Sequence, residues 1–212
     1  TILWSGMMNY ATYGPNAAFT DIIPESRLKQ ITPKDLVEKI KQLTTYKHRV
    51  FYYGQKELKE VKDIINRHHE QKKRYADYPD EKKFAELETN ENKVLFVHYD
   101  MVQAQVLFIS KGEVFNPQLV PYASLFGEYF GSGLSSITFQ EIREARALAY
   151  SAFSAFTSPR NDDQSHYVYG YVATQVDKME EASEAMLELM NNMPKAPQQF
   201  NSAKEATLKK IE

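Results

Sequence analysis

The sequence predicts an α+β protein with a mixed or antiparallel sheet and helices packed on one face. Three observations lead to this prediction. Amphipathic helical patterns and short aromatic or β-branched runs follow one another in a mixed order, rather than in strict strand–helix alternation. Aromatic residues are plentiful, with 14 tyrosines and 12 phenylalanines, and many stand at alternating positions, as in strands. Two such runs, at 149–157 and 166–174, are separated by a turn containing Pro159, which indicates an antiparallel hairpin.

The helices are indicated by apolar residues three and four positions apart. Thr32-Pro33, an N-cap followed by proline at the first helical position, begins the first of them. Helices are expected at 32–47, from Leu58 to beyond Ile65, at 119–130, at 135–146, at 177–193 and from Gln198 onward.

Short apolar runs closed by turn residues indicate the strands, which are expected at 48–54, 93–100, 104–112, 149–157 and 166–174. The charged stretch 71–83, which contains Pro79, fits neither period and is the expected linker.

Composition excludes several classes of function. A net charge of -2 gives no electrostatic reason to expect nucleic acid or an anionic membrane as partner. The absence of cysteine excludes disulfides, thiol catalysis and cysteine-ligated metals. No apolar run approaches the roughly 20 residues that span a bilayer, so we expect a soluble protein of the bacterial periplasm or cytoplasm, the compartment staying open. The chain starts at Thr1 and ends inside a helical pattern, so we expect it to be cut from a longer protein.

The most informative stretch is 131–150, GSGLSSITFQEIREARALAY. A glycine-containing turn leads into an amphipathic helix, and Arg143 stands seven residues before Tyr150. Seven residues make about two helical turns, so both side chains are expected to address one surface.

This stretch resembles a segment in the C-terminal half of the pitrilysin-type (M16, inverzincin) zinc metallopeptidases, which carries an arginine and a tyrosine in R-x6-Y spacing. The resemblance covers about residues 85–212. The matching positions are Gly133, Ser135, Ser136, Phe139, Gln140, Glu141, Ile142, Arg143, Glu144, Leu148, Tyr150 and Ser151. Ile137-Thr138, Ala145 and Ala147 depart from the common Arg-Leu, Lys or Gln, and Gly, which indicates a divergent branch.

The resemblance also implies a domain organisation. Residues 20–66 resemble, more weakly, the closing part of a preceding domain of the same family. Residues 1–78 are therefore expected to be the closing part of that M16-like domain plus the linker. Residues 79–212 are expected to be the first part of an M16 C-terminal, inactive, R-x6-Y domain.

The zinc signature of the family, H-x-x-E-H, occurs nowhere in this sequence. The resemblance therefore implies that the full-length enzyme binds zinc outside this segment and that no cofactor is bound here. His68 and His69 are adjacent in a helical pattern and would point about 100° apart, so we expect a solvated helix end rather than a metal site.

By resemblance, Tyr150 would donate to the oxyanion of the scissile bond, and Arg143 would hold the substrate backbone, so both are candidate catalytic and substrate-binding residues. Taken without the family, Arg143 would be an ordinary surface residue and Tyr150 a packing residue. Arg146 is expected to be ordinary surface. The implied partners are a peptide, added as a strand to a sheet edge, and an N-terminal M16 half in the same chain or in a partner subunit.

The segment alone is expected to hydrolyse nothing. The alternative left open by the sequence is a non-catalytic M16-like structural or peptide-binding subunit.

Overall fold

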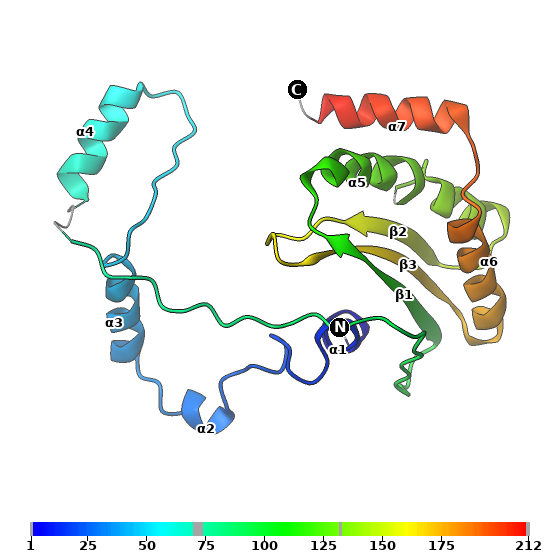
Figure 1. Ribbon diagram of the computed structural model, residues 1–212, viewed down its shortest axis with the longest axis horizontal. Helices are drawn as coiled ribbons and strands as arrows, with labels where there is room; N and C mark the ends of the chain where they lie inside the picture. Colours follow the sequence, from blue (N-terminus) through cyan, green and yellow to red (C-terminus); the bar gives the residue numbers. More distant parts are fainter. Residues whose placement is uncertain (1, 70–73, 132, 211–212) are drawn as a thin grey trace. The chain divides into compact units, whose positions relative to one another are not determined.

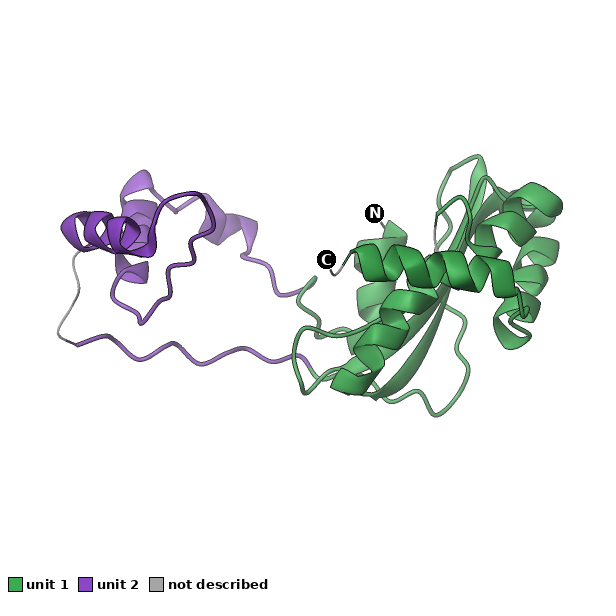
Figure 2. Ribbon diagram, turned by 90° about the horizontal axis from the view of Figure 1, so that it is seen from above, with its two compact units in different colours: residues 1–19, 85–212 green, residues 20–84 purple. Residues whose placement is uncertain are grey.

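The computed structural model describes residues 2–69, 74–131 and 133–210. Contacts within the chain divide it into two compact units (Figure 2). Unit 1 comprises residues 1–19 and 85–212, and unit 2 comprises residues 20–84. This division does not test the domain boundary expected at residue 78, which stays a prediction.

Unit 1 is built on an antiparallel sheet of three strands in the order β1-β3-β2 (Figure 1). The strands are β1 (Gln103–Val114), β2 (Ser151–Thr157) and β3 (Ser165–Gln175). Val172 in the central strand pairs with Val106 on one side and with Ala152 on the other. The three strands expected in this region and the hairpin between β2 and β3 are confirmed.

Helices α5 (Val120–Phe126) and α6 (Met179–Asn191) cover one face of this sheet, and α7 (Pro197–Lys209) packs on α5 and on residues 127–131 (Figure 1). Helix α5 continues directly as a π-helix at Gly127–Gly131. A short 3-10 helix at Val176–Lys178 precedes α6. Val172 and Met186 are fully buried between sheet and helix. Phe130, Ile142, Leu148 and Leu189 belong to the same hydrophobic core. The α+β fold class and the helical layer on one face are confirmed.

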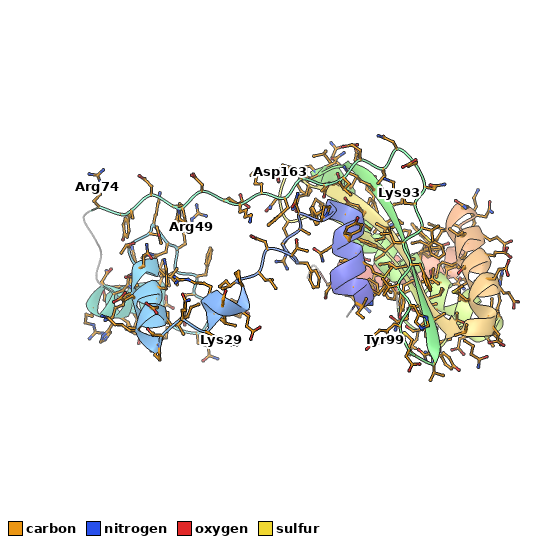
Figure 3. All side chains as sticks on the ribbon, turned by 90° about the horizontal axis from the view of Figure 1, so that it is seen from below. Lys29, Arg49, Arg74, Lys93, Tyr99 and Asp163 are labelled. Atoms are coloured by element: carbon orange, nitrogen blue, oxygen red, sulfur yellow. The ribbon has the colours of Figure 1, made fainter. Side chains whose placement is uncertain are left out.

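The opposite face carries a helical segment that the sequence patterns did not indicate. A π-helix, Ile2–Met7, leads directly into α1 (Met8–Tyr13). The Trp4 ring stacks on Phe153 at a centroid distance of 5.7 Å and lies 5.1 Å from Tyr171. In Figure 3 the sheet lies between this blue segment and the orange α6. The aromatic side chains on the second face of the strands are therefore covered as well.

Unit 2 contains α2 (Glu25–Leu28), α3 (Pro33–Leu43) and α4 (Leu58–His68). Helix α3 begins with a capping box, in which the Thr32 hydroxyl accepts from the Asp35 amide at 3.3 Å and the Asp35 carboxylate accepts from the Thr32 amide at 2.8 Å. These hydrogen bonds lower the pKa of Asp35. Both helices expected in this region are confirmed.

Two expected strands, 48–54 and 93–100, are wrong for this structure, since neither segment has regular secondary structure. Phe51 is 87% exposed and Phe96 is 82% exposed. A strand needs a neighbouring segment to satisfy its backbone amides and carbonyls, and the described residues provide none for either run. An alternating apolar pattern reports that a segment suits a sheet, but it carries no information about the partner strand.

Candidate functional site

The segment that carries Arg143 begins with a tight glycine turn. Gly133 has φ +99°, a conformation that favours glycine. Ser136 closes the turn, since its amide and its hydroxyl both donate to the Gly133 carbonyl, at 3.1 and 2.9 Å. The Ser136 hydroxyl also accepts from the Phe139 amide at 3.3 Å. This network fixes the start of the helical segment 137–145, of which Phe139–Ala145 is a π-helix.

Arg143 lies on the outer side of this π-helix, while Ile142 beside it is fully buried. Its guanidinium carbon lies 4.8 Å from the centre of the Phe139 ring, a cation–π contact. Its Nε lies 3.8 Å from a carboxylate oxygen of Glu144, and the side chain is 46% exposed. The guanidinium is thus held against its own helix and keeps donors open to solvent.

The helix ends well before Tyr150, so the expectation that the seven-residue spacing corresponds to two helical turns is wrong. Helical geometry stops at Ala145, and Ala147 adopts a left-handed conformation with φ +50°. The Leu148 amide then donates to the Ile142 carbonyl at 3.1 Å, and the buried Leu148 side chain anchors the turn. The chain therefore changes direction between the two candidate residues.

Tyr150 stands at the corner where this turn enters β2. Its amide donates to the Ala173 carbonyl of β3 at 2.8 Å, which adds one ladder bond ahead of β2. The side chain is 52% exposed. Its hydroxyl accepts a hydrogen bond from Nε2 of Gln175 at 3.0 Å. Because the hydroxyl oxygen is an acceptor here, its own hydrogen stays available for an acceptor outside the protein.

Both candidate residues therefore lie at the surface of unit 1, and neither is part of the core. The contacts of Arg143 join it to its own helix, whereas those of Tyr150 join it to β3. Arg146 is a surface residue as well, 40% exposed, and its Nη1 lies 3.3 Å from a carboxylate oxygen of Glu188 on α6. The roles of Arg143 and Tyr150 in binding or catalysis stay predictions.

The structure adds two residues to this corner that sequence reasoning missed. Gln175, the last residue of β3, contacts the Tyr150 hydroxyl, and the fully buried Thr174 donates through its hydroxyl to the Leu148 carbonyl at 2.5 Å. Both are separated from the motif by about 25 residues. A helical or alternating period within one segment gives no signal for such a contact.

The described residues contain no group of three or more histidine, cysteine, aspartate or glutamate side chains that could hold a metal ion. The fold does bring His48 to His69, with 2.6 Å between their Nε2 atoms. His68 lies on the last turn of α4, and Glu70 lies outside the described residues. Within the described part of the chain, no helix is long and apolar enough to cross a membrane.

Comparison with known proteins places these features in a family. The model of the family described as the peptidase M16 inactive domain matches residues 30–207. A protease from Helicobacter pylori shares this fold, with a TM-score of 0.65 and 16% identity over 96% of this chain and 51% of that chain. This chain therefore spans about half the length of the Helicobacter pylori protein.

A peptidase M16 inactive domain from Pseudomonas fluorescens aligns over 51% of this chain and 26% of that chain, with 18% identity and a TM-score of 0.42. None of the curated proteins matches this chain. The family model covers most of the sequence, including the segment that carries Arg143 and Tyr150. The chain belongs to the peptidase M16 inactive-domain family.

Proposed function

We propose that this chain is part of an M16-type zinc metalloendopeptidase that hydrolyses peptides, to which it contributes Tyr150 and Arg143. The observation that carries the proposal is the arrangement at Tyr150. An exposed phenol accepts a hydrogen bond from Gln175, so its own hydrogen points to no protein acceptor among its described contacts. Family membership supports the assignment to a peptidase-like protein.

The proposed chemistry of Tyr150 is stabilisation of negative charge. Attack on a peptide bond places charge on the carbonyl oxygen, and a donor aimed at that oxygen lowers the barrier. A tyrosine hydroxyl is a neutral donor at pH 7 and is suited to this oxygen. The Gln175 amide, by donating to the same hydroxyl oxygen, would make the phenolic hydrogen a better donor through the polarisation of linked hydrogen bonds.

Arg143 would bind the peptide backbone near the scissile bond. A guanidinium is permanently charged and offers several donors in a fixed plane, which suits carbonyl and carboxylate oxygens. Its contact with the Phe139 ring restricts the side chain without using its donors. Strand β2 lies at the edge of the sheet and begins directly after Tyr150. A peptide added as a strand along β2 would therefore pass close to the Tyr150 hydroxyl.

The residues of this segment do not fit a zinc site. The sequence has no H-x-x-E-H motif, and the described residues hold no suitable cluster of ligands. In the proposal the zinc belongs to an N-terminal M16 half, in the same chain or in a partner subunit. The segment by itself would hydrolyse nothing.

The test is made in the full-length protein with a series of peptides. Tyr150→Phe removes only the hydroxyl and is expected to lower kcat/KM by about 100-fold or more, the usual cost of losing one oxyanion donor. Arg143→Ala is expected to raise KM and to lower kcat/KM. Arg146→Ala is the matched control, since it removes a surface arginine of the same turn and is expected to leave both constants unchanged.

Unchanged kcat/KM in both the Tyr150 and the Arg143 variants would contradict the proposal. Absence of peptide hydrolysis in a full-length protein without H-x-x-E-H would instead select the non-catalytic, structural or peptide-binding subunit. Hydrolysis that appears only when a second, metal-bearing subunit is added would place the zinc in a partner chain.

A further inference from the structure

Unit 1 contains a second polar site, away from the Tyr150 corner. A cavity of about 160 Å³ lies between α1 and the turn that joins β2 to β3. Its polar lining comes from distant parts of the sequence, including Asn9, Tyr13, Glu86, Gln164, Tyr167 and Tyr169. Three phenols and one carboxylate thus face one small space.

The carboxylate of Glu86 is largely buried, and protein contacts fix its position. Its side chain is only 10% exposed, and both of its oxygens accept from the Ser165 amide, at 3.1 and 3.2 Å. Its cationic neighbour is Lys111 on β1, whose Nζ lies 3.8 Å from a Glu86 oxygen and whose side chain is 13% exposed. The buried carboxylate is therefore held in place by backbone and by β1.

The charges of Glu86, Glu88 and Lys111 do not cancel. Lys111 also lies 3.5 Å from a carboxylate oxygen of Glu88, and it donates to the Leu87 carbonyl at 3.0 Å. One ammonium is thus shared between two carboxylates. Lys111 does not line the cavity, whereas Glu86 does. The negative charge of Glu86 is therefore only partly compensated, and it lines the cavity in a partly desolvated place, where a charge interacts strongly.

The second feature of this site is the Tyr167 hydroxyl, which is buried without a hydrogen-bond partner in the described structure. The residue as a whole is 7% exposed. Buried hydroxyls without partners are uncommon, because each costs the energy of its lost hydration. Burial raises the pKa of Tyr167, and the Glu86 carboxylate raises it further through its charge and through its proximity to the phenol, so the phenol is neutral and its oxygen is free to accept. A ligand with N–H donors would satisfy it.

We infer that this cavity binds an alkylammonium group, supplied by a lysine side chain or by a free α-amine. The Glu86 carboxylate provides the opposite charge, the Tyr167 hydroxyl and the Gln164 and Asn9 side chains provide acceptors, and the faces of the phenol rings favour a cation. Thr157 at the lining is exposed, so the cavity is reached from solvent. The inference does not rest on the proposed peptidase function.

The test is calorimetric titration of the full-length protein with three small probes. N-acetyl-lysine-amide carries the side-chain ammonium, and norleucine amide carries only the α-ammonium. N-acetyl-norleucine-amide has the same carbon chain and no charge. Saturable binding of either charged probe, with no binding of the neutral one, is the expected result, and the probe that binds identifies the source of the ammonium.

Glu86→Gln is expected to weaken binding of the charged probe by about tenfold or more, because a charge-assisted hydrogen bond is lost. Glu88→Gln is the matched control: it removes the other carboxylate near Lys111, is 78% exposed and does not line the cavity. Its affinity is expected to stay within twofold of wild type.

Tyr167→Phe serves as a second variant, since it leaves the ion pair with Lys111 intact and removes a hydroxyl that has no partner. It is expected to fold normally and to bind the charged probe more weakly. The inference is overturned if the neutral probe binds as well as the charged ones, if no probe binds saturably, or if neither variant changes the affinity.

Discussion

Nε2 of Gln175, the last residue of β3, donates a hydrogen bond to the hydroxyl of Tyr150 at a distance of 3.0 Å. The two residues are 25 positions apart, and the contact forms because β2 and β3 are antiparallel neighbours. The amide both restricts the phenol and occupies its oxygen. In the proposed function Gln175 is therefore a positioning residue for Tyr150.

Gln175→Leu tests this relationship in the full-length protein. Loss of one hydrogen bond of net worth about 1 kcal/mol is expected to lower kcat about fivefold while KM stays unchanged. Gln105→Leu makes the same chemical change on the exposed side of β1 and is expected to have no effect. A Gln175 variant with wild-type kcat, or one that changes only KM, would show that Gln175 does not act through Tyr150.

The protein is expected to be more stable with glycine than with alanine at position 147. The φ of Ala147, +50°, is left-handed, which costs a residue with a Cβ about 1 kcal/mol or more. Ala147→Gly should therefore raise the free energy of unfolding by about 0.5–1 kcal/mol, measured by urea denaturation. Ala145→Gly, at the end of the helical segment, should lower it by about 1 kcal/mol. A destabilised Ala147→Gly protein would contradict the strained turn.

Two glycines of one π-helix, Gly127–Gly131, should respond oppositely to alanine. A Cβ at Gly131 would lie 2.6 Å from the carbonyl oxygen of Ser154 in β2, so the helix would have to move from the sheet. Gly131→Ala should cost about 1–3 kcal/mol in thermal or urea unfolding. Nothing lies within 4 Å of a Cβ at Gly127, and Gly127→Ala should stabilise by up to about 1 kcal/mol. Equal effects at the two positions would contradict this packing.

Stability should fall at high pH because of the phenols in unit 1. Burial raises the pKa of Tyr167, Tyr169, Tyr171 and Tyr13 in the folded protein above that of an exposed tyrosine. A raised folded-state pKa means that the neutral phenol is favoured, so this contribution is complete below about pH 10 and is lost as the pH rises further. The urea midpoint should therefore decrease above pH 10.

Tyr167→Phe should reduce this loss, since the variant has no phenol to ionise at that position. Tyr122→Phe, at a side chain that is 67% exposed, should keep the wild-type dependence on pH. Parallel curves for wild type and Tyr167→Phe between pH 8 and pH 11 would show that Tyr167 does not contribute.

The local patterns of the sequence determined most of the elements and the fold class. The capping box at Thr32, the strands β1, β2 and β3, and the amphipathic α6 follow from residues within a few positions of one another. The motif at 131–150 identified the family before any coordinates, because it depends on residue types at fixed spacing. It also pointed to Ala147 as a departure from glycine, at a position whose backbone is left-handed.

Tertiary structure alone decided which segments pair and what surrounds the candidate residues. Residues 48–54 and 93–100 have the pattern of strands but remain unpaired in the described structure. A strand is stabilised by hydrogen bonds to a partner strand, and its own sequence pattern does not specify which segment that partner is. The contact between Gln175 and Tyr150 and the cavity around Glu86 depend on residues far apart in the chain. Short-range periodicity reports which face of an element is apolar, whereas packing against distant segments decides what each polar group meets.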